Sequence, residues 1–319
     1  MTSIMNIQYL NFEDPIKTLD LQIQELITLS SQKGINYKPE IRSLQKKKVS
    51  SLHKMYKNLT PWEIIQVARH PQRPILQDYL QHLFIDFREL HGDKCFGDDR
   101  ALITGLGEIG TERVMILGHN KGKNTEENIT RNFGSSHPEG YRKALQKMKF
   151  AEKFGIPVIS FIDTPGAYPG VGSEERCVAR AISENLVAMS TLKVPIICII
   201  IGEGGSGGAL GIGVGDRLSM LEFSYYSVIS PEGCSAILWK DSDHMVEAAA
   251  ALKLDSSSLL KLKLVDEVIL EPIGGAQRSH HDIMYNVKNY ILRTLKGLKR
   301  TKMENLLGNR YKKIRAAGK

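Results

Sequence analysis

The sequence predicts a layered α/β fold in which the strands of a parallel sheet alternate with helices. Continuous apolar runs at residues 158–162 and 194–201 are typical of strands that are buried on both faces. Each run leads into a glycine-containing loop and then into a segment with helical character. With 319 residues, of which 42% are hydrophobic, the chain is long enough to bury a complete core around such a sheet.

The N-terminal region predicts a helical hairpin. Pro15 and Pro39 are each placed to open a helix, and a break at Lys33–Gly34 separates the two helices. The apolar residues that recur at helical spacing are Ile16, Leu19, Ile23 and Leu26 in the first helix and Ile41, Leu44, Leu52, Met55 and Leu59 in the second. Such a hairpin cannot bury both apolar stripes by itself, so we expect it to pack on the core or on a partner.

The remaining elements follow in order along the chain. Strands are expected at residues 101–107, 114–118, 158–162, 194–201, 228–230 and 265–270. Helices are expected at residues 138–154, 174–191, 209–214, 243–252, 256–263 and 280–296. We therefore divide the chain into an N-terminal helical region (1–74), an α/β domain (75–296) and a basic C-terminal tail (297–319).

Charge and cysteine content limit the possible function classes. The net charge of +8 fits binding to acidic partners, coenzyme A phosphates or nucleic acid, and it equally fits a solvated basic surface. The four cysteines have no paired spacing and form no Cys-x-x-Cys, so we expect reduced, buried thiols and no zinc site. No apolar run is long enough to span a membrane and no signal peptide is visible, so we expect a cytoplasmic protein.

The most informative stretch is the glycine-rich loop that follows the strand at 194–201. Backbone without side chains at a strand-to-helix turn exposes N–H groups beside the positive end of a helix, which favours anion binding. One interpretation is therefore an oxyanion hole made of backbone amides alone. A turn that needs glycine only for tight helix–strand packing gives the same pattern.

Two further motifs match the same loop. Gly202-x-Gly204-x-x-Gly207 fits the dinucleotide-binding fingerprint, with Glu222 near the position of a ribose contact. Ser206 fits the nucleophile elbow of serine hydrolases, because glycines lie two residues away on either side. The acid and base of such a triad follow in the hydrolase order as Asp266 and His280.

A second loop, at residues 163–170, narrows the choice. It reads Asp-Thr-Pro-Gly-Ala-Tyr-Pro-Gly and follows the strand at 158–162. Because the carboxyl ends of parallel strands meet at one edge of a sheet, we expect this loop to lie beside the glycine-rich loop, where ligands of such sheets bind. This pairing of loops resembles that of the biotin-dependent carboxyltransferases, which have the crotonase (ClpP-like) fold.

The resemblance extends over roughly residues 10–290. The chain is similar to the alpha subunits of bacterial acetyl-coenzyme A carboxylase carboxyltransferase. The segments that carry this similarity are His70–Pro74, Gly118–Lys123, Arg131–Gly134, Pro138–Ala144, Ser230–Cys234 and Glu271–Gln277. The chain departs from the family at Cys177, where a glycine is expected, and in its unusually basic C-terminal end. The implied fold is a crotonase-like, ββα-type layered fold with an N-terminal helical hairpin extension.

The resemblance also implies an activity and its partners. The family transfers a carboxyl group from carboxybiotin, held on a biotin carboxyl carrier protein, to acetyl-CoA, and the malonyl-CoA formed enters fatty acid biosynthesis. An ATP-dependent biotin carboxylase loads the biotin. The alpha subunit is active only with a beta subunit, which binds most of the acyl-CoA and carries zinc, and we expect an α₂β₂ assembly. No metal is expected on this chain.

The resemblance assigns site residues to both loops. The backbone oxyanion hole is expected within Gly204, Gly205, Gly207 and Gly208, with the choice between the pairs Gly204–Gly205 and Gly207–Gly208 left open. The biotin pocket is expected to be lined by Asp163, Thr164, Pro165, Gly166, Ala167, Tyr168, Pro169 and Gly170.

Several alternatives stay open from the sequence. One is an acyl-CoA decarboxylase or hydratase of the same fold, and another is a second activity in nucleic-acid binding. Lys121 and Lys123 either meet an anionic ligand or belong to a solvated surface. His70, His119 and His137 lack the partners of a metal site, so we expect packing or hydrogen-bonding roles for them.

Overall fold

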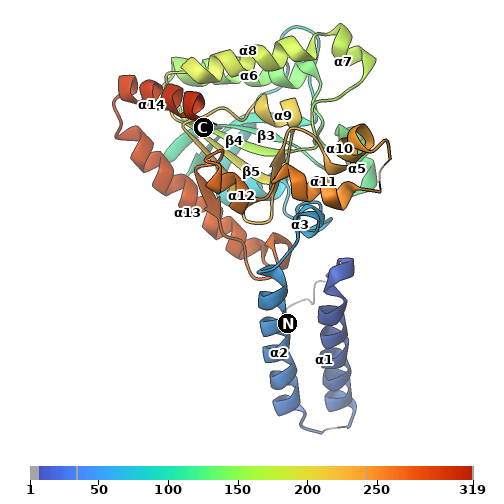
Figure 1. Ribbon diagram of the computed structural model, residues 1–319. Coiled ribbons are helices and arrows are strands. Elements are labelled where there is room, and N and C mark those ends of the chain that lie inside the picture. The colour runs from blue at the N-terminus through green and yellow to red at the C-terminus, as the bar shows by residue number, and fades with distance from the viewer. Residues whose placement is uncertain (1–6, 34, 242, 318–319) are drawn as a thin grey trace.

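An eight-stranded mixed sheet forms the centre of the computed structural model, which describes residues 7–33, 35–241 and 243–317 (Figure 1). The strands are β1 (Ile85–Glu89), β2 (Leu102–Ile109), β3 (Glu112–His119), β4 (Val158–Thr164), β5 (Ile196–Gly205), β6 (Arg217–Leu221), β7 (Tyr225–Ser227) and β8 (Glu267–Ile269). Their order is β1-β2-β3-β4-β5-β6-β8, and β7 pairs with β5. The pairs β1–β2 and β2–β3 are antiparallel, whereas every other pair is parallel. The predicted α/β fold with parallel strands is confirmed.

Helices cover both faces of the sheet. The main ones are α3 (Pro61–Ala68), α4 (Leu76–Leu83), α6 (Pro138–Lys153), α8 (Val178–Thr191), α12 (Ser256–Lys261) and α13 (His280–Lys299). One apolar cluster joins α4 and α13 to the sheet, and a second joins α6, α8 and α12 to its other face. Along β5, Ile197 and Ile199 enter the first cluster, and Ile196 and Ile200 enter the second. This alternation explains why a strand covered on both sides has a continuous apolar sequence.

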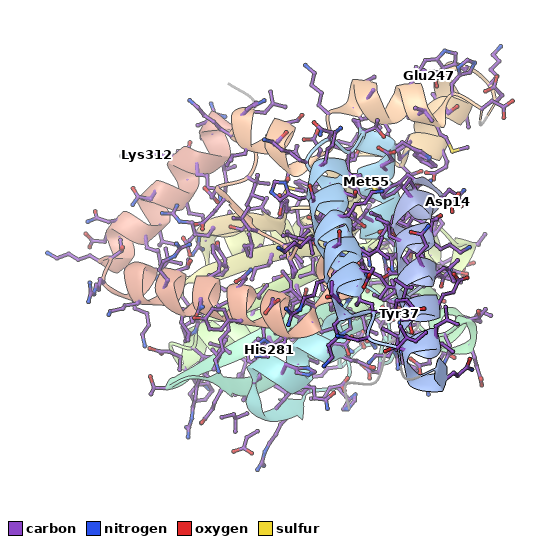
Figure 2. All side chains as sticks on the ribbon, turned by 90° about the horizontal axis from the view of Figure 1, so that it is seen from below. Asp14, Tyr37, Met55, Glu247, His281 and Lys312 are labelled. Atoms are coloured by element: carbon purple, nitrogen blue, oxygen red, sulfur yellow. The ribbon has the colours of Figure 1, made fainter. Side chains whose placement is uncertain are left out.

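The predicted N-terminal hairpin is confirmed. Helices α1 (Asp14–Lys33) and α2 (Lys38–Tyr56) lie side by side and project from the body of the molecule (Figures 1 and 2). At its base, Ile16, Leu52 and Tyr56 pack with residues of the main body. Part of the predicted joint, Gly34, lies outside the described residues.

Three expected elements differ from the structure. The strand expected at 228–230 is wrong: β7 lies three residues earlier, and Ser230 instead caps α10 (Pro231–Leu238) by accepting a hydrogen bond from Gly233 N–H. The helix expected at 174–191 is broken into α7 (Val171–Glu175) and α8, because Cys177 takes a left-handed conformation between them. The helix expected at 209–214 instead spans Ser206–Leu210, as α9.

The cysteine prediction is partly wrong. The four thiols are unpaired, but only Cys198 is buried, whereas Cys95 and Cys177 are exposed. The two exposed thiols lie outside the apolar segments, Cys95 in a bend and Cys177 in a turn. Burial raises the pKa of the Cys198 thiol to about 12, so this cysteine remains protonated.

Residues beyond 297 complete α13 and then form another helix. Helix α14 (Met303–Ala316) lies near the C-terminal end of α8 (Figure 1). Arg310 is fully buried there: it pairs with Asp216 at 2.8 Å and donates to the carbonyls of Met189, Leu192 and Val194. The remaining elements are the short helices α5 (Thr125–Thr130) and α11 (Met245–Leu252) and three single 3₁₀ turns.

Candidate active site

The structure brings the two predicted loops together at the carboxyl ends of β4 and β5. The strands pair in parallel, and Thr164 at the end of β4 lies opposite Gly204 at the end of β5. The loop at 163–170 therefore begins beside the glycine-rich loop at 204–208. The register between β4 and β5 shifts just before this point, which lets both strands turn out of the sheet.

Two of the four candidate glycines are required by this packing. A Cβ atom on Gly205 would lie 2.1 Å from the Pro165 carbonyl oxygen, and one on Gly208 would lie 2.5 Å from the carbonyl carbon of Gly166. The loops therefore touch backbone to backbone. Gly207 differs, because a Cβ there would meet only the Ile182 side chain, at 3.6 Å.

The same four glycines differ in the elements to which their amides belong. Gly204 and Gly205 are ladder residues of β5, where they pair with β7. Gly207 and Gly208 lie in the first turn of α9, whose initial N–H groups have no acceptor within the helix. Among the described residues, neither of these two amides donates a hydrogen bond to an atom outside α9. An anion approaching this turn would meet two adjacent N–H groups.

The loop at 163–170 is held by its own hydrogen bonds. The Thr164 hydroxyl accepts from the Gly166 N–H at 3.1 Å and donates to the Gly166 carbonyl at 2.8 Å. The Tyr168 N–H donates to the Ser136 carbonyl at 3.0 Å. Asp163 and Thr164 are buried, Pro165 and Pro169 are exposed, and the other members are half-buried.

A buried ion-pair network lies directly behind the loops. The Lys121 ammonium lies 2.8 Å from the Asp163 carboxylate and 2.6 Å from the Glu203 carboxylate. Glu203 also pairs with Arg69 at 2.7 Å and accepts a hydrogen bond from the Tyr225 hydroxyl at 2.6 Å. Burial opposes ionisation of Glu203, but Lys121 and Arg69 overcome it and hold the pKa of this carboxyl at about 2.

This network was missed by the sequence reasoning and corrects one expectation. Lys121 is neither a solvated residue nor free to bind an anionic ligand, because two carboxylates already neutralise it. The pKa of Lys121 is raised: burial opposes its charge, and the attraction of Asp163 and Glu203 outweighs that cost. Lys123, two residues later, is largely exposed and pairs with Asp78 at 2.6 Å.

The dinucleotide interpretation does not fit the site. Gly202 and Gly204 lie within β5 and not in a turn. The Glu222 carboxylate accepts the N–H of Glu271, so it is engaged in joining two chain segments.

The serine hydrolase interpretation fails for lack of a base. Ser206 does have the left-handed backbone of a strand-to-helix elbow, with φ of 51°. However, the His280 ring bonds to the Gln72 carbonyl, and Asp266 accepts from the Leu218 N–H and pairs with Lys313. Within the described residues, no hydrogen bond links Ser206, Asp266 and His280 into a triad.

The three histidines near the motifs have the expected hydrogen-bonding or packing roles. The His70 ring bonds to the Gln8 carbonyl at 2.8 Å, and the His137 ring bonds to Ser173 and lies against Tyr168. His119 is fully buried. Burial, helped by the charge of Lys121, lowers its pKa to about 3, so it remains neutral.

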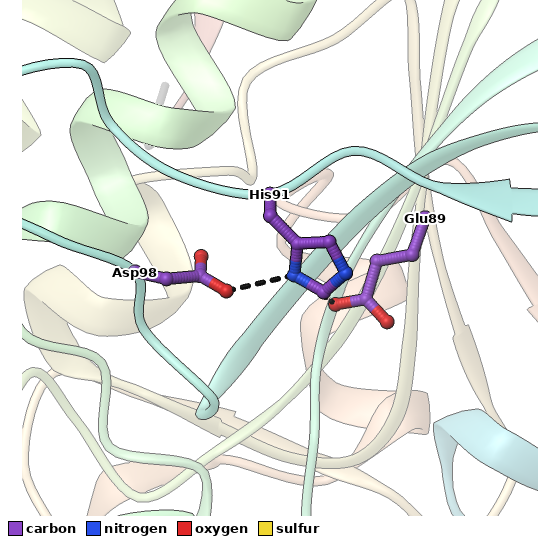
Figure 3. Close-up of side chains that lie close together, drawn as sticks. All are labelled: Glu89, His91 and Asp98. Carbon is purple, nitrogen blue, oxygen red and sulfur yellow. Dashed lines mark hydrogen bonds and ion pairs between the residues drawn. The ribbon is translucent and has the colours of Figure 1, made fainter.

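One exposed side-chain trio offers metal-ligating atoms away from the two loops. Glu89, His91 and Asp98 place one ligand atom each within 4.8 Å of one another (Figure 3). Asp98 already pairs with Lys143 at 2.5 Å and with the His91 ring at 2.8 Å. These contacts account for the arrangement without an ion.

Comparison with known proteins identifies the family. A family model described as acetyl co-enzyme A carboxylase carboxyltransferase-like matches residues 9–318. The acetyl-coenzyme A carboxylase carboxyl transferase subunit alpha of Wigglesworthia glossinidia brevipalpis is 51% identical over 98% of this chain and 99% of its own length. Subunits of the same name from Rhodopirellula baltica (51% identical, covering 97% of both chains) and Vibrio cholerae (49% identical, covering 97% of this chain and 98% of the relative) are also similar.

Solved structures support the fold. Transcarboxylase 12S superposes with a TM-score of 0.60 at 18% identity, covering 75% of this chain and 45% of that one. A Pseudomonas malonate decarboxylase hetero-tetramer gives 0.56 at 16% identity, covering 67% and 86%. The predicted crotonase-like fold is confirmed by these neighbours.

Among the described residues, no helix has the length and apolar character needed to cross a bilayer. With the family model and the relatives matching nearly the whole chain, the chain belongs to the family of acetyl-coenzyme A carboxylase carboxyltransferase alpha subunits.

Proposed function

We propose that this chain is the alpha subunit of an acetyl-CoA carboxylase carboxyltransferase, which moves a carboxyl group from carboxybiotin to acetyl-CoA and forms malonyl-CoA. The observation that carries this proposal is the identity of about half of all positions with alpha subunits of that name, over almost the full length of both chains. His280 and Asp266 are engaged with other groups and form no triad with Ser206, which argues against the serine hydrolase alternative.

The oxyanion hole is assigned to the amides of Gly207 and Gly208. They form the pair whose N–H groups are not used by the sheet, and Gly207 has no packing need for glycine. These amides would donate to the ureido oxygen of biotin, where negative charge grows as the carboxyl group leaves. Preorganised donors of this kind contribute on the order of 3–4 kcal/mol each to transition-state stabilisation.

Proton transfer needs no side-chain base from these loops. The carboxylates of Asp163 and Glu203 are paired with Lys121, and Ser206 lacks a basic partner. We assign removal of the acetyl-CoA methyl proton to the departing biotin anion, positioned by the two amides. The second oxyanion, on the thioester, then requires donors from another subunit.

The exposed and half-buried part of the loop at 163–170 is assigned to the biotin pocket. Its members are Pro165, Gly166, Ala167, Tyr168, Pro169 and Gly170. The buried Asp163 and Thr164 support this loop from behind. Pro165 and Pro169 limit its backbone freedom, so its shape is largely set before biotin arrives.

The partners follow from the same proposal. A beta subunit with bound zinc would supply most of the acyl-CoA site in an α₂β₂ assembly, and a biotin carboxyl carrier protein and biotin carboxylase would deliver the carboxyl group. We place the complex in the cytoplasm. Nucleic-acid binding by the basic surface is a separate hypothesis that a salt titration of RNA binding would test.

The experiment is reconstitution with a beta subunit from the same genome. The complex should convert malonyl-CoA and free biotin into acetyl-CoA and carboxybiotin, which a coupled assay detects. A complex that decarboxylates malonyl-CoA equally well without biotin would support the decarboxylase alternative. A complex that shows neither reaction would overturn the proposal.

A further inference from the structure

Lys121 connects the ends of the two strands that carry the catalytic loops. Its ammonium bridges Asp163, the next-to-last residue of β4, and Glu203, near the end of β5. The side chains of these three residues are only 15%, 7% and 9% exposed. The Glu203 N–H also donates to the Asp163 carboxylate at 2.9 Å, so the two strand ends are joined twice.

The two carboxylates of this bridge differ in the number of cations that pair with them. Glu203 has a second cation, Arg69, which also pairs with Glu232 of α10 at 2.5 Å. For Asp163, Lys121 is the only cation at ion-pair distance within the described part of the chain.

The other polar groups around the bridge do not replace that charge. The neutral His119 ring lies 3.4 Å from the Asp163 N–H, Tyr225 donates to Glu203, and Arg131 donates to the Lys121 carbonyl. Loss of the Lys121 charge would leave Asp163 as a buried anion facing a second one, Glu203.

The position of these strand ends controls the loops in front of them. Gly205 touches Pro165 and Gly208 touches Gly166 through backbone atoms, so neither loop can shift without the other. An oxyanion hole works only when its donors are held within about 0.5 Å of the productive geometry. A misplacement of about 1 Å can reduce turnover on the order of 100-fold.

We propose that Lys121 is a positioning residue for carboxyl transfer: by bridging Asp163 and Glu203 it sets the relative placement of the two loops that form the oxyanion hole and the biotin pocket. This inference rests on the proposed function, because it concerns the same two loops. Lys121 acts through the two carboxylates and does not itself contact substrate.

The test compares Lys121→Met with Lys123→Met in the complex with the beta subunit. Lys123 is a matched control because it lies on the same loop, is 59% exposed and pairs with Asp78 outside the bridge. Lys121→Met should lower kcat about 100-fold at pH 8, with KM for acetyl-CoA within about twofold of wild type, because the hole and not the acyl-CoA site is displaced. Lys123→Met should remain within about twofold in both constants.

The pH dependence of activity and a charge-removing double variant distinguish a positioning role of Lys121 from general destabilisation. In Lys121→Met the two carboxylates repel each other, so one of them binds a proton more readily and its pKa rises. Activity relative to wild type should therefore recover as the pH is lowered from 8 to 6. The double variant Lys121→Met/Asp163→Asn should regain at least tenfold over the single variant at pH 8, because Glu203 keeps Arg69 and the new amide oxygen still accepts the Glu203 N–H.

Each outcome decides the question. An inactive wild-type complex overturns the proposed function, whereas an active wild type with near-normal kcat in Lys121→Met overturns only the positioning role. A loss that neither the double variant nor lower pH relieves also overturns it. If Lys121→Met fails to assemble, the double variant decides: assembly with restored turnover supports the charge bridge, and assembly without turnover contradicts it.

Discussion

Ser206 has the backbone of a catalytic elbow without the chemistry of one. Its left-handed φ of 51° turns the chain from β5 into α9, and its side chain is exposed. The glycines on either side of it do not have positive φ, so the strained position is held by a serine. Ser206 thus serves to turn the backbone between β5 and α9.

Ser206→Ala should therefore retain activity within about tenfold, or about 1.4 kcal/mol in activation free energy. A nucleophilic serine would lose several orders of magnitude on the same change. Steady-state kinetics of the reconstituted complex measure this, and labelling of Ser206 by a fluorophosphonate would contradict the backbone interpretation.

Gly207→Val tests the oxyanion hole. The new side chain has room beside Ile182, so folding should survive, whereas the approach of the ureido oxygen to the amides should be blocked. We expect kcat to fall on the order of 100-fold or more, with a smaller change in KM for acetyl-CoA. A folded, assembled variant with near-normal kcat would remove this amide from the hole.

Gly205→Val serves as the contrast. Its Cβ would overlap the Pro165 carbonyl at 2.1 Å, so the loops themselves must separate. We expect a loss of about 1–3 kcal/mol in unfolding free energy together with the loss of activity, seen as a lower Tm. Unchanged thermal stability would show that the loops are not packed as described.

Glu203 makes stability depend on acid pH. Its folded pKa of about 2 lies below the ordinary glutamate value of 4.5, so its ion pairs contribute stability above pH 4.5 that is lost as the pH falls toward 2. The full contribution is on the order of 3 kcal/mol. Denaturant unfolding between pH 7 and 3 should show that the difference between wild type and Glu203→Gln shrinks toward acid pH; a constant difference would contradict this.

The glycine loops could be found from the sequence, and the charge network behind them could not. Glycine and proline act locally, so Gly207 and Pro165 indicate loops wherever they stand. Lys121 and Glu203 are 82 positions apart, and nothing local to either one predicts that they meet. The clue was their place near strand ends, since Lys121 follows β3 and Glu203 lies near the end of β5.

At the scale of elements, secondary structure was predicted correctly where all residues of a segment share one environment, such as burial on both faces of the sheet. The run at 194–201 reads as a strand because both of its faces are buried, and β5 is found there. Prediction failed where one residue overrides the pattern: Cys177 interrupts a segment with helical spacing, and Ser230 begins a helix where a strand was expected. Helix α14 was not predicted because its sequence is rich in charged residues. Nothing in that sequence distinguishes Arg310, which is buried, from the charged residues that are exposed.

Arg310 anchors α14 to the body of the protein. Arg310→Met would leave Asp216 as a buried, unpaired anion and remove donors from three carbonyl groups. We expect a loss of about 3–5 kcal/mol in unfolding free energy. Denaturant unfolding measures it, with Arg315→Met, an exposed residue of the same helix, as the control that should change stability by less than about 0.5 kcal/mol. Equal effects of the two changes would mean that α14 does not depend on this anchor.

The molecule as a whole places its candidate catalytic loops at one edge of a single sheet. Its hairpin projects well away from that sheet, and the trio of Glu89, His91 and Asp98 is explained by internal ion pairs (Figures 1 and 3). Carboxyl transfer develops negative charge at two places, on biotin and on the thioester, whereas the oxyanion hole proposed for this chain consists of one pair of amides, those of Gly207 and Gly208. The chain is thus suited to stabilise one of the two oxyanions of the reaction.

The purified chain alone should therefore show no carboxyl transfer, and activity should appear when the beta subunit is added. Light scattering should then report a mass that corresponds to α₂β₂, and activity should rise with beta subunit until the two chains are equimolar. Gly207→Val should assemble equally well and remain inactive, because assembly depends on the surface and turnover depends on the two amides. Robust malonyl-CoA decarboxylation with biotin as acceptor by the chain alone would show that a single copy supplies both oxyanion holes, and the two-subunit mechanism would have to be abandoned.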